Sequence, residues 1–126
     1  MTLRQLIVSA LLLTSAALTH AIEFQPYSAA ALAAAQKADK PVALQFHADW
    51  CPTCRAQDKV LQMLKAEPGL DVTVFKVNYD TERDLKRRFK VNTQSTLIVL
   101  RGQKETARSV NDTTVDGIRG SLKTAL

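Results

Sequence analysis

The stretch that decides the fold is residues 42–54, which read VALQFHADWCPTC. Residues 42–48 form a short, largely apolar run of the kind that makes a buried strand. From Cys51 onward, apolar residues recur with helical spacing. Pro52 suits the first turn of such a helix, because a proline there lacks only an N–H that would be unpaired anyway. The stretch therefore predicts a buried strand that runs directly into a helix over residues 51–66.

The chain has two cysteines, Cys51 and Cys54, and they stand three residues apart. A disulfide that closes so short a loop removes little entropy from the unfolded chain, so a purely structural bridge is the weaker alternative. Free N–H groups and the dipole at a helix start stabilise a thiolate, which is the reactive form of cysteine. We therefore expect Cys51 to be an exposed nucleophile with a lowered pKa, and Cys54 to be the buried thiol that resolves a mixed disulfide.

The rest of the chain alternates between helical and strand patterns. Helices are expected over residues 28–37, 82–89 and 114–126. Strands are expected over residues 72–77, 96–100 and 105–110, with a short edge strand near 23–24. Ser28 is the expected N-cap of the helix over residues 28–37. Thr81 is the expected N-cap of the helix over residues 82–89, where Asp84 would complete a capping box. This order predicts an α/β protein whose sheet is covered by helices on both faces.

The first 21 residues have the pattern of a secretory signal peptide. Arg4 precedes an apolar run over residues 6–18, and Ala21 stands where a signal peptidase cuts. The run is shorter than the roughly 20 residues that a membrane-spanning helix needs, so an uncleaved anchor is the weaker alternative. We expect a signal peptide over residues 1–21, one domain over residues 22–126, and export to a bacterial periplasm.

The 126-residue chain has a formal net charge of +5, and its basic residues are spread along the sequence. The densest basic run, residues 86–90, falls in a helical pattern with acids at Glu82 and Asp84. Such a run is typical of a solvated helix face. We therefore expect no nucleic-acid partner, and contact with a membrane only through an uncleaved signal segment.

The motif over residues 46–54, an apolar strand running into Ala-x-Trp-Cys-x-x-Cys, resembles that of the thioredoxin family. Its Ala-Asp-Trp-Cys portion is most similar to the C-terminal domain of the membrane thiol-disulfide interchange protein. Residues 74–80 and 96–100 also resemble family strands. The resemblance implies a thioredoxin-like fold with a central mixed sheet, and thiol-disulfide exchange with protein substrates and with a membrane or periplasmic redox partner. No cofactor is expected.

Two residues depart from the family pattern at positions that serve the active site. Gln45 stands where thioredoxins usually carry a buried Asp beneath the second cysteine, accompanied by a Lys at the position of Lys76. Glutamine cannot take up or release a proton, so deprotonation of Cys54 would depend on water, Lys76 or the departing thiolate. Ser95 stands at the family's cis-proline. A non-proline cis bond costs about 3 to 4 kcal/mol, so we expect Gln94-Ser95 to be trans.

The resemblance also assigns supporting roles around the cysteines. Gln94 and Ser95 lie in the loop that, in relatives, pairs with the substrate backbone. Trp50 can flank a substrate disulfide, and a Trp before the first cysteine resembles reducing members of the family. Pro52 is shared with the strong periplasmic oxidant, whereas Thr53 replaces that oxidant's His. We therefore expect a reductase or electron-passing protein rather than a primary oxidant.

Two other functions remain open from the sequence. Cys51, Cys54 and His47 could hold Cu(I) or zinc in a periplasmic metal carrier, although a structural zinc site uses about four ligands. His47 alternates with Gln45 and Asp49, so all three should point to one sheet face. Packing with one hydrogen bond is the expected role of His47, and tuning of the Cys51 thiolate is the alternative. We therefore assign no metal. Alternatively, the dithiol is vestigial in a thioredoxin-fold interaction protein.

Overall fold

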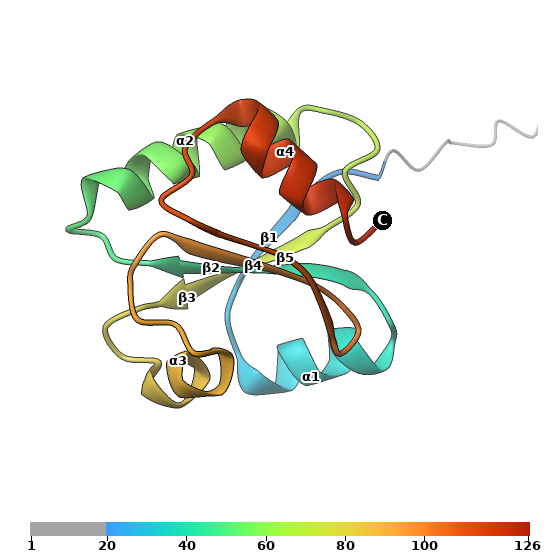
Figure 1. The fold of residues 1–126 in the computed structure, drawn as a ribbon. Helices are drawn as coiled ribbons and strands as arrows, with labels where there is room; N and C mark the ends of the chain where they lie inside the picture. The colour runs from blue at the N-terminus through green and yellow to red at the C-terminus, as the bar shows by residue number, and fades with distance from the viewer. Residues whose placement is uncertain (1–19) are drawn as a thin grey trace, which may run out of the picture.

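The computed structural model describes residues 20–126, which contain a five-stranded mixed sheet with the order β1-β3-β2-β4-β5 (Figure 1). Strands β1, β3 and β2 run parallel to one another, and β4 pairs antiparallel with both β2 and β5. The strands are β1 (Glu23–Pro26), β2 (Pro41–His47), β3 (Thr73–Asn78), β4 (Thr96–Arg101) and β5 (Lys104–Val110). The predicted fold class is confirmed, including the short edge strand.

Four helices cover the sheet in two pairs: α1 (Ala29–Lys37) and α3 (Arg83–Phe89) on one face, α2 (Pro52–Lys65) and α4 (Val115–Lys123) on the other (Figure 1). Each pair encloses its own hydrophobic core against the sheet. Leu61 and Ile118 belong to the core under α2 and α4, and Leu32 and Leu85 to the core under α1 and α3. Two helical layers around one sheet therefore give each face of the sheet its own hydrophobic core.

Strand β2 lies at the centre of the sheet and contributes to both layers. Successive side chains of a strand point to opposite faces, so Leu44 and Phe46 enter the core under α1 and α3. Ala43 enters the opposite core. Gln45 and His47 point to the same face as Ala43, towards α2, as their alternation predicts. The strand therefore packs one face with apolar residues and presents polar side chains beneath α2.

Most element boundaries lie within two residues of those expected, but two predictions were wrong. Thr81 does not cap α3: the N-cap is Glu82, and no side chain caps the helix. The chain enters α3 through a turn in which the N–H groups of Thr81 and Glu82 both donate to the Asn78 carbonyl, so the helix starts one residue later. Asp84 pairs instead with Arg87. The last helix ends at Lys123 rather than at residue 126.

Residues 1–19, nearly all of the expected signal peptide, lie outside the described residues. Within residues 20–126, no helix has the length and hydropathy to cross a membrane.

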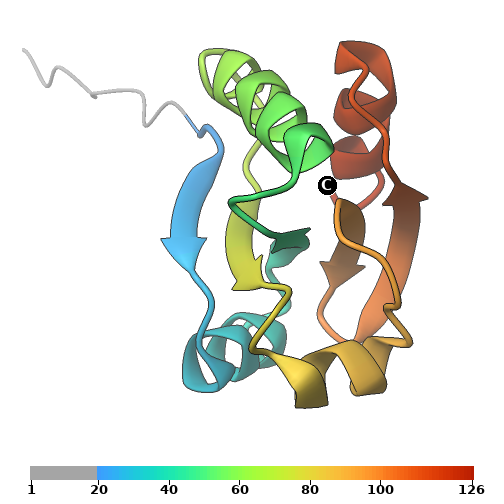
Figure 2. The ribbon, with the colours of Figure 1, turned by 90° about the vertical axis from the view of Figure 1, so that its left-hand side faces the viewer.

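The end of the sheet where β2 runs into α2 gathers several loops (Figure 2). The β2–α2 and β3–α3 connections emerge there, because parallel strands end at the same edge. The segment before β4 returns to this edge, where the Ser95 N–H donates to the Phe46 carbonyl at 2.8 Å. Side chains distant in sequence therefore meet around the start of α2.

Two glycine substitutions should shift stability in opposite directions. Gly102 turns the chain between β4 and β5 with φ +56, and a Cβ there would lie 2.7 Å from Asp39 Oδ1. Gly102→Ala should therefore lower the free energy of unfolding by about 1 kcal/mol or more. Gly120 lies in α4, and a Cβ added there would meet no atom within 4 Å. Gly120→Ala should therefore raise the free energy of unfolding by about 0.5–1 kcal/mol. Urea denaturation measures both, and a Gly102→Ala protein of unchanged stability would contradict the turn.

Candidate active site

Cys51 is the N-cap residue of α2. Its backbone is extended, with φ −90 and ψ 113, and the N–H of Cys54 donates to its sulfur at 3.1 Å. Pro52 occupies the first helical position, as the sequence predicts. Half-buried Thr53 follows within the first turn. The sulfur of Cys51 thus takes the place of the oxygen that usually caps a helix, and it faces the N–H groups of the first turn.

Both cysteines are buried, so the expectation that Cys51 is exposed was wrong. Cys51 is 3% exposed and Cys54 is fully buried, and both pack with Ala48 and Tyr79. Cys51 is turned inward because its sulfur accepts hydrogen bonds from within the domain. The prediction that Cys54 is the more buried of the two cysteines is confirmed, since only Cys51 has any exposed surface.

The surroundings of the two thiols move their pKa values in opposite directions. Burial opposes ionisation of Cys51, but hydrogen bonds from the Cys54 thiol, the Ser95 hydroxyl and the backbone of Cys54 and Thr53 outweigh it and lower its pKa. Burial raises the pKa of Cys54, and the neighbouring Cys51 raises it further. Cys51 is therefore the thiol that ionises first, as predicted.

Ser95 meets both sulfurs. Its Oγ lies 2.9 Å from Cys54 Sγ and 3.4 Å from Cys51 Sγ, and the residue is fully buried. The Gln94-Ser95 bond is trans, as expected, since no cis peptide occurs among the described residues. Ser95 instead adopts φ 60, an uncommon backbone conformation for a residue other than glycine.

The backbone of Ser95 is occupied inside the domain. Its N–H donates to the Phe46 carbonyl, and its own carbonyl accepts from the Asn111 N–H at 3.0 Å. Gln94 is half-buried, and its carbonyl accepts from the Thr93 hydroxyl at 3.4 Å. Substrate binding by this pair stays a prediction, and the geometry leaves Gln94 rather than Ser95 to make backbone contacts with a substrate.

Gln57 also supports this loop, although it was not predicted from the sequence. Its side-chain amide, fully buried, donates to the carbonyls of Ser95 at 3.4 Å and Asp112 at 3.1 Å. Gln57 lies three residues after Cys54, which places it on the same side of α2. That spacing is the signal that could have identified it.

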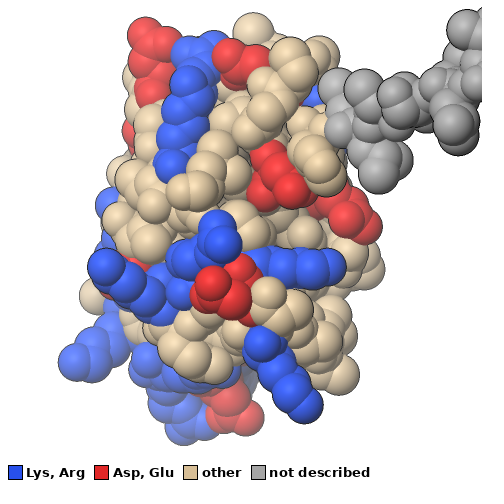
Figure 3. Space-filling model, turned by 90° about the vertical axis from the view of Figure 1, so that its right-hand side faces the viewer, with Lys and Arg blue, Asp and Glu red and all other residues tan. Residues whose placement is uncertain are grey.

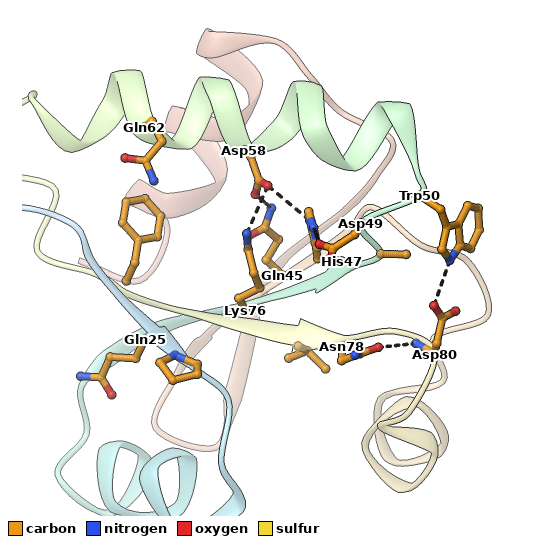
Figure 4. A pocket seen from close by; sticks show the side chains of 14 residues that line it. Gln25, Gln45, His47, Asp49, Trp50, Asp58, Gln62, Lys76, Asn78 and Asp80 are labelled. Atoms are coloured by element: carbon orange, nitrogen blue, oxygen red, sulfur yellow. Dashed lines mark hydrogen bonds and ion pairs between the residues drawn. The ribbon is translucent and has the colours of Figure 1, made fainter.

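Beside the dithiol, a pocket of about 680 Å³ runs between α2 and the β1–β3–β2 part of the sheet (Figure 4). Asp58 reaches into it from α2 and joins three predicted site residues. Gln45 donates to Asp58 Oδ1 at 2.7 Å, Lys76 Nζ lies 3.2 Å from Asp58 Oδ2, and His47 Nδ1 lies 3.4 Å from the same oxygen. The structure thus places a carboxylate on the helix, above the strand position where Gln45 replaces the family's acid.

Asp58 could have been found from its spacing, because it follows Cys54 by four residues, one turn further along the same helix face. Gln45 is buried, whereas the side chain of Lys76 is half-exposed at the pocket wall. Lys76, which in the family accompanies a strand acid, here forms an ion pair with a helix acid.

The imidazole of His47 lies between two carboxylates. It is 5% exposed, its Nε2 lies 2.9 Å from Asp49 Oδ1, and its other nitrogen faces Asp58 without a hydrogen bond. These contacts agree with the predicted role of His47, which was packing with one hydrogen bond. Across residues 20–126, no group of three or more His, Cys, Asp or Glu side chains is arranged to hold a metal ion. His47 therefore does not supply the third ligand that the metal-carrier hypothesis needs.

Trp50 lies on the surface next to Cys51, at one end of the pocket (Figure 4). It is 59% exposed, and its indole N–H donates to Asp80 Oδ2 at 2.9 Å. Asn78 Oδ1 in turn accepts from the Asp80 N–H, which fixes the turn after β3. A large apolar ring is thus held in one orientation at the start of α2.

Comparison with known proteins gives consistent matches. The sequence model of the thioredoxin family matches residues 27–124. A crystal structure of Trxlp from Edwardsiella tarda is 38% identical, with a TM-score of 0.75, and the match covers 79% of this chain and 98% of that one. A thioredoxin of Mycobacterium bovis is 35% identical over 72 residues, 57% of this chain and 62% of that protein.

A further match is the peptide-N(4)-(N-acetyl-beta-glucosaminyl)asparagine amidase of Caenorhabditis elegans, 29% identical over 89 residues. That match covers 71% of this chain but only 13% of the amidase. The chain therefore spans less than two thirds of the length of these two curated relatives.

Removing the Asp58 carboxylate should destabilise the fold. Asp58→Ala leaves the buried Gln45 amide without its acceptor, so the free energy of unfolding should fall by about 1–3 kcal/mol. Asp71 is a matched control, because its carboxylate is largely exposed and lies 3.4 Å from the exposed His20, and Asp71→Ala should cost about 0–1 kcal/mol. Urea denaturation of both variants measures the difference. Equal losses would mean that the buried amide does not depend on Asp58.

Proposed function

Since the chain belongs to the thioredoxin family, we propose that it is a thiol-disulfide oxidoreductase that exchanges disulfides with protein substrates through Cys51 and Cys54. The observation that carries the proposal is the inequality of the two thiols. Cys51 caps α2 with a lowered pKa, and Cys54 lies fully buried beside it with a raised pKa. A nucleophile that ionises and a resolving thiol that stays protonated are what a two-step exchange requires.

The reaction proceeds in two steps. The Cys51 thiolate attacks one sulfur of a substrate disulfide, that S–S bond breaks, and the other substrate sulfur leaves as a thiolate. Cys54 then loses its proton and attacks Cys51 Sγ, which releases the second substrate thiol. The products are a reduced substrate and a Cys51–Cys54 disulfide, so two electrons have passed from the protein to the substrate. An external dithiol donor reduces the protein again.

Trp50 and the pocket beside it are the surface that a substrate segment would meet. Trp50 immediately precedes Cys51 in the chain, its ring is exposed, and Asp80 fixes its orientation. A rigid aromatic side chain gives a large contact area at little entropic cost. Figure 3 shows the side of the molecule away from the start of α2, where basic and acidic side chains are interspersed, a distribution that does not favour nucleic-acid binding on that side.

We place the protein in a bacterial periplasm and assign it a reducing or electron-passing role. The signal-peptide pattern of residues 1–21 supports the location, and a domain over residues 22–126 would be the exported part. Trp50 before the first cysteine supports the direction through its resemblance to reducing relatives, and Thr53 supports it because the strong periplasmic oxidant carries a His at that position. A membrane or periplasmic redox partner would supply the electrons.

Trapping on cysteine variants tests this proposal. Cys54→Ala should keep substrates covalently attached to Cys51, because the resolving thiol is missing. Cys51→Ala is the matched control and should trap nothing, since buried Cys54 ionises less readily. The unaltered protein should catalyse reduction of a protein disulfide by dithiothreitol, and both variants should lose this activity. Equal trapping by both variants would contradict the assigned nucleophile, and an inactive unaltered protein would contradict the function.

A further inference from the structure

Ser95 carries a buried hydroxyl that lies between the two cysteine sulfurs, and this hydroxyl has no counterpart in a proline. Its Oγ is 2.9 Å from Cys54 Sγ and 3.4 Å from Cys51 Sγ. We propose that the Ser95 hydroxyl is a catalytic group that carries the proton of Cys54 towards the departing substrate sulfur during the resolving step. This inference rests on the proposed disulfide exchange and assigns a residue to the proton transfer within it.

The position of the hydroxyl is fixed by the main chain. The Ser95 N–H is held by the Phe46 carbonyl at the end of β2, and the Ser95 carbonyl by the Asn111 N–H. The Gln57 amide adds a third bond from α2. The residue is fully buried, so no bulk water competes for the hydroxyl. A side chain with so little freedom stays aimed at the sulfurs throughout the reaction.

The chemistry of a hydroxyl suits this position. A serine side chain has one O–H donor and two acceptor lone pairs. It can therefore accept a hydrogen bond from the Cys54 S–H while it donates one to the sulfur of Cys51. Gln45 cannot exchange a proton, and Asp58 and Lys76 are paired with each other at the pocket. Among the described hydrogen bonds, the oxygen-bearing side chain that meets Cys54 Sγ is that of Ser95.

The proton balance of the step is closed. In the mixed disulfide, Cys51 Sγ is bonded to a substrate sulfur. Cys54 Sγ attacks Cys51 Sγ and gives its proton to Ser95 Oγ, while Ser95 passes its own hydroxyl proton, through one water molecule at the accessible edge of Cys51, to the substrate sulfur as the mixed S–S bond breaks. One S–S bond forms and one breaks, the substrate leaves as a thiol, and Ser95 is restored. In this step the Cys54 sulfur loses one electron and the departing substrate sulfur gains one, so that over both steps the two cysteines together give two electrons to the substrate.

Removing the hydroxyl without straining the backbone tests the relay. Glycine accepts a φ of 60 readily, so Ser95→Gly deletes only the side chain. The reduced protein is mixed with excess oxidised glutathione, and mass spectrometry follows the Cys51–glutathione mixed disulfide and its conversion to the internal disulfide. In Ser95→Gly the conversion should slow by about ten- to a hundredfold, whereas formation of the adduct should change much less. The adduct should therefore accumulate.

Two further variants separate the hydroxyl from packing and strain. Ser109→Ala removes another poorly accessible hydroxyl, one without a hydrogen-bond partner. In this variant the glutathione adduct should convert to the internal disulfide at the rate of the unaltered protein. Ser95→Ala should slow conversion as much as Ser95→Gly does. If the adduct of Ser95→Gly converted as fast as that of the unaltered protein, or if conversion were slow only in Ser95→Ala, the proton relay would be contradicted. The proposed disulfide exchange would not be affected by either result. If the unaltered protein formed no glutathione adduct, the exchange function and the relay would both fall.

Discussion

The hydrogen bond from the Cys54 N–H to the sulfur of Cys51 is the interaction on which the chemistry of this site depends. It exists because α2 begins at residue 52, so that Cys51 caps the helix and Cys54 lies within its first turn. Together with hydrogen bonds from the Cys54 thiol and the Ser95 hydroxyl, the N–H groups of this turn lower the pKa of Cys51. Shifting the helix start would therefore disturb both the helix cap and the surroundings that favour the thiolate.

The central strand β2 places everything else around that helix start. Its alternation sends Phe46 into the core under α1 and α3, while Gln45 and His47 face Asp58 on α2. The carbonyl of Phe46, at the end of the strand, holds Ser95 against the sulfurs. The position and side-chain alternation of β2 therefore determine where the Ser95 hydroxyl lies relative to the two sulfurs, and which polar side chains line the pocket under α2.

Much of this arrangement could be predicted from local sequence. The run over residues 42–54 was enough for the strand, the helix start and the opposite behaviour of the two thiols, because periodicity and capping act over short distances. The depth of Cys51 could not be predicted, since the loop that covers it comes from residues far along the chain. The capping role predicted for Thr81 was wrong because the turn before α3 is anchored on the Asn78 carbonyl rather than on a side chain.

The sequence also identifies Gln45 and Ser95 as positions where a family residue is lost. Which group replaces the lost residue depends on neighbours in space, and these could not be predicted. At Gln45 the carboxylate comes from Asp58, and at Ser95 a hydroxyl reaches both sulfurs from a trans peptide.

The most direct test of the account is a pH titration of the reduced protein that follows the ultraviolet absorbance of the thiolate. The hydrogen bonds around Cys51 predict one thiolate that forms with a midpoint below the ordinary cysteine value of about 8.5, and a second that forms only above it. The first should vanish in Cys51→Ser and remain in Cys54→Ser. Two thiols that titrate together near the ordinary value would contradict the inequality on which the mechanism rests.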